Sequence, residues 1–277
     1  MIRPEPDASQ TALANTRAPG GLGDYLRKAL VIADVEVRKL RHDPSELIMR
    51  AIQPILWMVV FGEVFSRTRA IPTGDLPYLD FLAPGIIAQS AMFVAIFGGM
   101  SIIWERDLGI VHKFLVSPTP RTALALGKSV AGGVRALSQA IIVYVLACIM
   151  GVHLNWNPLN LLAVATIVVL GAVVFTSFSL IIALLVKTRE RFVGIGQVLT
   201  MPFFFASSAI YPLEVMPIWL KVLASINPLT YQVDALRVLM INGSTGSHPL
   251  WMDFAVLIGT AVVLTFIAGR LYPRAAT

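Results

Sequence analysis

The sequence predicts an all-α membrane protein with six transmembrane helices, and three observations lead to this fold class. Hydrophobic residues make up 56% of the chain and charged residues only 14%, whereas soluble domains carry about 25% charged residues. Long apolar blocks recur along the sequence, and most charges lie between them, as in loops that face an anionic membrane surface. A chain of 277 residues could not bury so much apolar surface in one aqueous core.

The composition also excludes several classes of function. The net charge of +6 forms no basic stripe with interleaved aromatic residues, so nucleic-acid binding is not expected. The single cysteine, Cys148, lies in an apolar run, where it is expected to fill the core and to be unreactive. The histidines show no metal-ligand spacing, so no metal site is expected. They are His42, His112, His153 and His248.

The N-terminal region is expected to lie outside the hydrocarbon core of the membrane. Residues 1–21 lack a long apolar core, which argues against a secretory signal peptide and predicts a disordered tail. In residues 22–42, apolar side chains recur at helical spacing and basic side chains occupy other positions. This pattern predicts an amphipathic helix at the cytoplasmic interface, and either the membrane surface or another protein could cover its apolar face.

A single transmembrane domain is expected over residues 47–270. Residues 43–46 read DPSE, a capping box with proline in the first turn, and predict the start of a first span over 47–66. Glu63, near the end of that span, is interpreted as an interface-facing residue rather than as part of a proton path. The second span is predicted over 81–103 and carries no charge.

The third span is predicted over residues 120–150 and is longer than a bilayer requires. At about 1.5 Å per residue it would measure roughly 45 Å, against a hydrocarbon core of about 30 Å. Because Lys128 and Arg135 lie in its first turns, the helix is expected to protrude into the cytoplasm before it enters the bilayer. A stripe of small residues would let another helix approach closely. The stripe consists of Gly132, Ala136 and Ala140.

The remaining spans are predicted over 158–186, 192–211 and 250–269. Asn157 followed by proline forms a good start for the fourth span, because asparagine caps a helix and proline fits its first position. Pro202 lies inside the fifth span and predicts a kink there, since proline removes a hydrogen bond from the helical ladder.

Residues 212–243, between the fifth and sixth spans, are too apolar for an ordinary aqueous loop. Proline breaks them into pieces that are too short to cross a membrane. Asn227 and Pro228 form a helix cap and a first position, and Gly243 forms a stop. Two short re-entrant or interfacial helices fit this pattern best, and a true span is the alternative.

The basic residues favour six spans with both termini in the cytoplasm, as in a multi-pass protein of the cytoplasmic membrane. A further span within 212–241 would move Arg270 and Arg274 to the outside. The segments assigned to the cytoplasm hold Arg38, Lys39, Arg41, Arg106, Lys113, Arg121, Lys187, Arg189, Arg191, Arg270 and Arg274. The segments assigned to the outside hold Arg67, Arg69, Lys221 and Arg237.

The sequence contains no catalytic signature. Residues 126–129 (LGKS) resemble the tail of a nucleotide-binding P-loop, but Thr122 replaces the required glycine and no buried strand precedes the motif. We therefore expect no bound cofactor on this chain, and any use of ATP would need another subunit. Zinc-protease and serine-hydrolase motifs and paired intramembrane carboxylates are also absent, so an enzyme is not expected. A secondary carrier or channel stays open as an alternative.

Two motifs resemble the membrane subunits of ABC transporters of the ABC-2 type, in the branch of daunorubicin-resistance and of nodulation or polysaccharide exporters. The first motif is WERDLG at 104–109, followed by Ser117, Pro118 and Arg121. The second is INPLTYQVDALR at 226–237. Their order and separation match the family pattern, and the likeness covers nearly the whole chain after the N-terminal tail.

The resemblance implies that the loop between spans two and three, about residues 105–117, holds a coupling helix that docks in a groove of a separate ATPase. That ATPase would bind ATP and Mg²⁺, and the N-terminal amphipathic helix would also contact it. Apolar side chains in the segment suit anchors in a groove, and a helix that only touches lipid headgroups is the alternative. The expected docking residues are Trp104, Glu105, Arg106, Asp107, Gly109, Lys113, Phe114, Ser117 and Pro118.

The resemblance also implies that two copies, or this chain and a similar one, enclose a path along which a drug, lipid or glycan leaves the cell. The re-entrant segment would form the outer gate. Asp234 and Arg237 lie three positions apart, so they could pair, line the gate or form a surface ion pair. The expected gate residues are Asn227, Pro228, Tyr231, Asp234 and Arg237.

Overall fold

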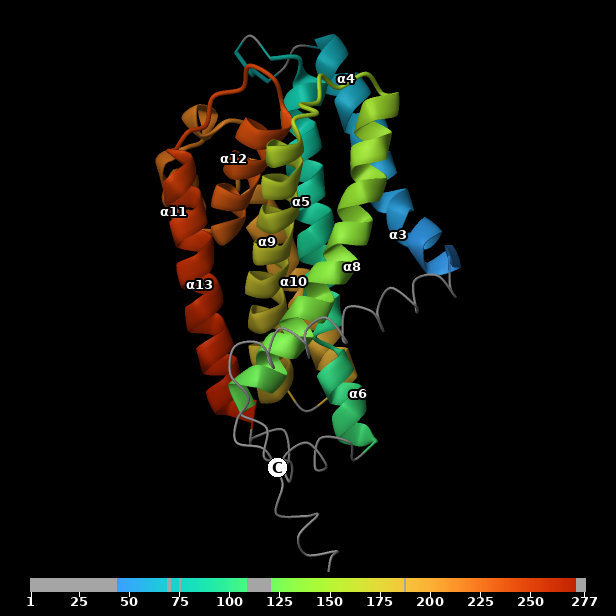
Figure 1. Cartoon of the computed structure of the whole chain (residues 1–277), viewed down its shortest axis with the longest axis vertical. Helices are drawn as coiled ribbons and strands as arrows, with labels where there is room; N and C mark the ends of the chain where they lie inside the picture. The colour runs from blue at the N-terminus through green and yellow to red at the C-terminus, as the bar shows by residue number, and fades with distance from the viewer. Residues whose placement is uncertain (1–43, 69–70, 75, 109–120, 187, 273–277) are drawn as a thin grey trace, which may run out of the picture.

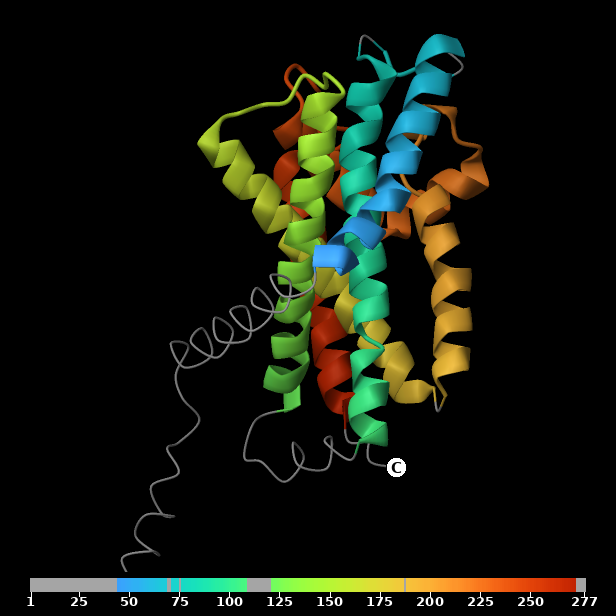
Figure 2. The ribbon, with the colours of Figure 1, turned by 90° about the vertical axis from the view of Figure 1, so that its right-hand side faces the viewer.

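The computed structural model is a bundle of helices that run roughly along one long axis (Figures 1 and 2). The predicted tail, the predicted amphipathic helix over 22–42 and residues 109–118 of the predicted docking segment lie outside the residues that the structure describes. The described residues are 44–68, 71–74, 76–108, 121–186 and 188–272.

The first helical stretch covers the predicted first span. It consists of α3 (Pro44–Leu56), a short π-helix η1 (Trp57–Phe61) and α4 (Gly62–Thr68). Pro54 lies inside α3 and has no N–H to donate to the helical ladder. The wider π-helical turn begins shortly after this proline, at a place where the regular hydrogen bonding is already interrupted.

The second predicted span is divided into α5 (Tyr78–Gly98) and α6 (Ser101–Asp107). Ser179, far along the chain, donates its hydroxyl to the carbonyl oxygen of Ile96 and so occupies an acceptor of the last turn of α5. A Cβ on Gly99 would clash with the same serine, so only glycine fits at the break. The span is predicted to end at residue 103, whereas helix α6 continues for four residues beyond it.

Helices α8 (Arg121–Ile149) and α9 (Pro158–Leu185) pack against each other and against α5. Helix α8 has 29 residues and is therefore about 43 Å long, in agreement with the length predicted for the third span. The side chain of Asn157 caps α9 as predicted. A Cβ on Gly132 would clash with the hydroxyl of Thr176, so the stripe of small residues lets α8 approach α9 closely.

Cys148 is exposed on α8, so the prediction that it fills the core is wrong. Three large apolar side chains spaced four residues apart on the same helix, Ile141, Val145 and Ile149, are also exposed. An apolar stripe of this kind suits a helix that faces lipid or another apolar surface.

Helix α10 (Arg189–Phe205) begins at a cap formed by Thr188 and ends well before residue 211, where the fifth span is predicted to end. Pro202 lies in its last turn, and the chain leaves the helix one turn later instead of kinking and continuing. Residues 206–210 follow without regular structure, yet all of them are buried. A buried irregular segment needs partners for its backbone polar groups, and other side chains supply them.

The chain then forms a 3₁₀ turn η2 (Leu213–Val215), two short helices α11 (Ile218–Ile226) and α12 (Pro228–Met240), and the long helix α13 (Leu250–Leu271). The two short helices agree with the prediction for residues 212–243. Helix α12 is buried along nearly its whole length and packs against α5, α9 and α13, whereas α11 is mostly exposed. Burial of α12 inside the bundle fits a re-entrant helix better than a surface-lying one (Figure 1).

Within the described residues, four helices are long and apolar enough to cross a membrane. The stretch α3–η1–α4 and helix α10 occupy the places of the other two predicted spans, and the six-span topology stays a prediction. The loops after α4 and α8 lie at the same end of the molecule as α12, while α6 and the end of α13 lie at the other (Figure 1). The four helices are Tyr78–Asp107, Ala125–Ile149, Pro158–Leu185 and Leu250–Leu271.

Candidate functional site

The end of α6 carries the first four predicted docking residues, and it is fixed to α8 by a short ion pair. The Nζ atom of Lys128 lies 2.6 Å from Oε1 of Glu105 and also donates a hydrogen bond of 3.4 Å to the hydroxyl of Ser101. Both charged side chains are largely shielded from solvent, with exposed fractions of 18% for the lysine and 26% for the glutamate. The pair therefore links α6 to α8 in a partly buried environment.

The same end of α6 is fixed to α9 and α10. Two nitrogens of Arg189, at the start of α10, lie 2.7 and 3.2 Å from Oδ2 of Asp107. The guanidinium of that arginine also stacks on the ring of Trp104, 3.7 Å from its centroid. Arg106 donates a hydrogen bond of 3.2 Å to the carbonyl oxygen of Val186, at the end of α9. Four consecutive residues thus contact three other helices.

Part of this segment stays available to a partner. Trp104 and Leu108 are exposed on one side, with exposed fractions of 49% and 69%. Glu105 and Asp107 are also predicted docking residues, and both carboxylates have partners within the chain. The other predicted docking residues lie outside the described residues; they are Gly109, Lys113, Phe114, Ser117 and Pro118.

A cavity of about 940 Å³ lies directly beside this end of α6 and reaches between α3, α5, α8 and α10. Its apolar wall includes Phe93 and Phe97, whose rings are stacked 6.3 Å apart. Trp104 and Glu105 belong to its lining, so the predicted docking segment forms part of the cavity wall. The polar side chains that line the cavity are Gln53, Gln89, Ser90, Ser101, Glu105, Arg135, Gln139 and Gln197.

Sequence reasoning missed the glutamines of this cavity. Gln89 lies in the middle of an uncharged apolar span, and Gln139 lies in the long third helix. Both are buried. A polar side chain inside a hydrophobic span is costly unless it has a role, so these positions carried a usable signal. The structure also places Arg135, whose role the sequence left open, in the wall of the cavity.

Glu63 does not line this cavity and lies in the first turn of α4. Its Oε1 atom is 2.6 Å from Nη2 of Arg67, four residues later, and both side chains are more than half exposed. An exposed pair of this kind contributes at most about 1 kcal/mol. The interpretation of Glu63 as a residue that faces the membrane interface stays a prediction.

At the opposite end of the bundle, Asn227 joins the end of α10 to the start of α12. Its Nδ2 atom donates hydrogen bonds of 2.7 and 2.6 Å to the carbonyl oxygens of Phe203 and Ala206. Its Oδ1 atom accepts from the N–H of Leu229 at 3.0 Å, which is the capping bond predicted from the sequence. The side chain of Asn227 therefore supplies hydrogen-bond partners both to the end of α10 and to the start of α12.

Arg237 supports the buried segment that follows α10. It donates a hydrogen bond of 2.6 Å to the carbonyl oxygen of Ser208 and one of 3.4 Å to that of Phe81, and its guanidinium lies 3.8 Å from the centroid of the Phe81 ring.

Asp234 binds a different segment, the loop that precedes α13. It accepts hydrogen bonds of 2.9 and 2.8 Å from the backbone N–H groups of Ser247 and His248. The exposed fractions of Asp234 and Arg237 are 1% and 4%, so the possibility of a surface ion pair is excluded. Within the described residues the two side chains take separate partners, and each stabilises a different irregular segment beside α12.

The other two predicted gate residues lie at the same place. Pro228 occupies the first position of α12, where its missing N–H costs nothing. The hydroxyl of Tyr231 donates a hydrogen bond of 2.8 Å to the carbonyl oxygen of Ser225, at the end of α11. The predicted gate residues thus hold α11, α12 and the end of α10 together.

Comparison with known proteins gives a family and several relatives. The family model described as "ABC-2 type transporter" matches residues 27–241. The putative transport permease ycf38 of Cyanophora paradoxa is 26% identical over 255 residues, which cover 88% of this chain and 85% of that protein. Its counterpart in Porphyra purpurea is 30% identical over 201 residues, which cover 72% and 69%. The daunorubicin resistance ABC transporter permease protein DrrB1 of Streptomyces coeruleorubidus is 24% identical over 233 residues, which cover 84% and 81%.

Proposed function

We propose that this chain, which belongs to the ABC-2 type transporter family as the membrane subunit of an ABC transporter, exports an amphipathic compound with energy from a separate ATPase. The substrate would be a hydrophobic drug, a lipid or a glycan-type compound. The ATPase would bind residues 104–118 from the cytoplasm. One observation carries this proposal: a single segment lines the cavity and is also fixed to α8, α9 and α10.

The contacts of α6 support a role in coupling. A force on residues 104–107 would reach α8 through Glu105 and Lys128, and α10 through Asp107 and Arg189. These are charged contacts of 2.6 to 2.7 Å, which hold their geometry better than apolar contacts do. Movement of an ATPase bound to this segment would therefore displace two walls of the cavity together.

The lining of the cavity supports an amphipathic substrate. Phe93, Phe97 and Met201 offer apolar and aromatic surface, while amide side chains offer hydrogen-bond donors and acceptors. Arg135 adds a cationic group that would favour a substrate with an acidic or acceptor oxygen. The relative DrrB1 is named for daunorubicin resistance, and we propose a hydrophobic drug as one substrate class on that basis.

The exposed rim of the cavity supports a second membrane subunit. Gln53 on α3 and Gln197 on α10 line the cavity and are exposed. Amide side chains that face hydrocarbon are costly. A second copy of the chain, or a similar chain, would cover both amides and complete the wall of a path.

The mechanism follows from these contacts. ATP binding draws two ATPase subunits together, and each moves the segment bound to it. Through α6, the movement reaches α8 and α10, and the cavity opens towards the outside. Residues 206–210 and helix α12 form the outer gate, and Asn227 and Arg237 hold its closed form. Coupling requires that the ATPase contacts differ between its nucleotide states.

The experiment is ATP-driven transport in inside-out vesicles that contain the tagged chain and the ABC ATPase that co-purifies with it. We expect fluorescent daunorubicin, or a fluorescent lipid, to accumulate only with hydrolysable ATP. The control is the same ATPase with its P-loop lysine replaced. Transport by the chain without any ATPase would overturn the proposal and establish a secondary carrier, and ATPase activity that no compound stimulates would also count against it.

A further inference from the structure

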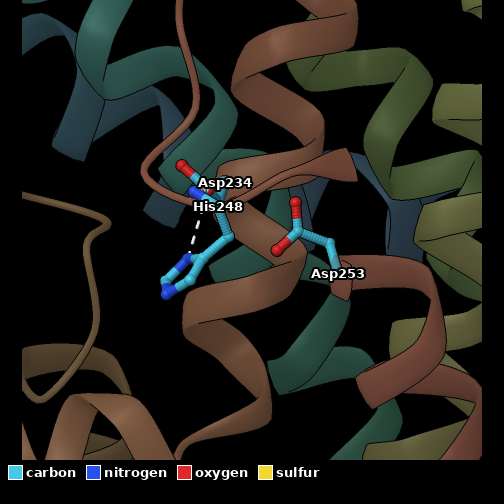
Figure 3. A group of neighbouring side chains, drawn as sticks. All are labelled: Asp234, His248 and Asp253. Atoms are coloured by element: carbon cyan, nitrogen blue, oxygen red, sulfur yellow. Dashed lines mark hydrogen bonds and ion pairs between the residues drawn. The ribbon is translucent and has the colours of Figure 1, made fainter. Parts of the chain in front are cut away.

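Three ligand-forming side chains from successive elements of the chain meet beside the middle of α12. They are Asp234 on α12, His248 in the loop that follows, and Asp253 in the first turns of α13. Each offers an oxygen or nitrogen atom that could bind a metal ion, and these atoms all lie within 4.8 Å of one another. Figure 3 shows the carboxylate of Asp253 turned towards the other two side chains.

Asp253 has no partner within the described residues that would stabilise its charge. Its exposed fraction is 0%, and neither of its carboxylate oxygens accepts a hydrogen bond. Asp234 beside it is equally buried and carries a second carboxylate. Burying a charged group without a partner costs several kcal/mol or more, and a like charge nearby adds to that cost. Among the described residues, no cation is hydrogen-bonded to the carboxylate of Asp253, so a negative charge there would be uncompensated.

Asp234 and His248 are already positioned by other contacts. Each oxygen of Asp234 accepts one backbone hydrogen bond, from Ser247 or His248, which leaves a lone pair for a further ligand bond. The ring of His248 packs against Tyr231 at 5.1 Å between centroids. Its Nδ1 atom lies 3.4 Å from Oδ2 of Asp234 and makes no hydrogen bond. The loop also leaves no room for a Cβ on Gly246, so the chain wraps closely around Asp234.

We propose that Asp234, His248 and Asp253 bind a divalent transition-metal cation of the Zn²⁺ class. One imidazole nitrogen and two carboxylate oxygens form a mixed set that Zn²⁺ accepts, and three protein ligands leave one position for water. Bonds of about 2.0–2.2 Å around a tetrahedral ion place ligand atoms roughly 3.3–3.6 Å apart. The three ligand atoms lie within 4.8 Å of one another, so side-chain rotations that bring them about 1 Å closer would complete the site. An exposed fraction of 22% for His248 provides access from solvent.

A cation here would tie α12 to α13 and to the loop between them. His248 and Asp253 lie beyond residues 27–241, the part of the chain that matches the family model. Histidine spacing in the sequence gave no hint of the site, because two of its three ligands are carboxylates and all three come from different elements. The proposal does not depend on the transported substrate or on the ATPase.

The test measures metal binding by the full chain in detergent. A chelator first removes any bound metal from the protein, and the protein is then titrated with Zn²⁺ or Co²⁺. We expect one ion per chain, visible absorption of the Co²⁺ complex, and a higher melting temperature with metal. Asp253→Asn and His248→Gln should each weaken binding at least about tenfold, since the loss of even an outer ligand costs that much. His153→Gln is the matched control, because that histidine binds Asp80 at the same end, with 2.8 Å between Nδ1 and Oδ2.

Two results would overturn the proposal. One is stoichiometric binding that persists in both Asp253→Asn and His248→Gln. The other is a wild-type chain that binds no ion while its melting temperature depends on pH alone, as expected if the two carboxylates share a proton. The two variants replace side chains by neutral groups of similar size, and a melting curve without metal shows whether each has folded.

Discussion

The ammonium of Lys128 on α8 lies 2.6 Å from the carboxylate of Glu105, the second residue of the WERD motif at the end of α6. The same lysine belongs to the LGKS sequence that resembles the tail of a P-loop. Its partner explains why a lysine stands there: it binds a carboxylate of its own chain and connects the predicted docking segment to the long third helix.

Removing one member of this pair should destabilise the protein more than removing both. Glu105→Gln leaves a partly buried ammonium without its carboxylate, and Lys128→Met leaves the carboxylate without its cation, whereas the double variant leaves neither. A double-mutant cycle on thermal unfolding in detergent should give a coupling of about 1 kcal/mol, because solvent still reaches both groups. Additive effects within error would contradict a direct link between α6 and α8.

The Asp107 and Arg189 pair should matter for coupling rather than for stability. Both side chains are about 40% exposed, so their contribution to unfolding is expected to be small. Reversing one charge, as in Asp107→Arg, should lower substrate-stimulated ATPase activity severalfold, and adding Arg189→Asp should restore part of it. Glu63→Arg, in an exposed pair on α4, serves as control and should leave stimulation unchanged. Failure of the double reversal to restore any activity would count against the pair.

Asn227 should contribute more to stability than an ordinary helix cap. Asn227→Ala removes the cap of α12 and leaves the carbonyl oxygens of Phe203 and Ala206 without their donor, which should cost about 2–3 kcal/mol of unfolding free energy. Asn157→Ala is the matched control, since that asparagine also precedes a proline but is exposed and only caps α9, for about 1 kcal/mol. Equal losses in thermal or denaturant unfolding would show that the bonds to α10 contribute nothing.

Labelling from the two sides of the membrane tests the orientation. In a Cys148→Ser background, Lys113→Cys should react with a membrane-impermeant maleimide only after the cells are permeabilised. Thr245→Cys, in the exposed loop before α13, should react in intact cells. Mass-shift detection on a gel gives the readout. Labelling of position 113 in intact cells would place the predicted docking segment outside and exclude a cytoplasmic ATPase as its partner.

Local sequence signals identified the helices well, while their ends depended on distant residues. Apolar blocks and proline-linked caps predicted α8, α9, α12 and α13, because span length and capping are local properties. The end of α10 could not be predicted, since Asn227 and Arg237 supply the partners that let residues 206–210 remain buried outside a helix. These partners come from a later helix, and no local pattern specifies them.

At the candidate site, too, the local sequence indicated which residues matter, whereas their contacts depend on residues far along the chain. The WERD motif was identified from its charges, but its contacts with Lys128, Val186 and Arg189 arise from helices that follow it by many residues. Their spacing of three positions left open whether Asp234 and Arg237 pair, line the gate or form a surface ion pair. In the structure each binds a partner from another segment. Spacing along one helix shows which residues share a face, and tertiary packing decides what they touch.

Site-specific photo-crosslinking at Phe114 tests the central claim, that the segment following α6 binds an ATPase. The photoreactive amino acid replaces Phe114 in cells that contain the natural partner proteins, and Trp219, exposed on α11 at the other end of the bundle, serves as control position. Mass spectrometry of the adducts should identify an ABC ATPase at position 114 and not at position 219. Adducts with lipid alone at position 114, or the same ATPase at both positions, would contradict the account.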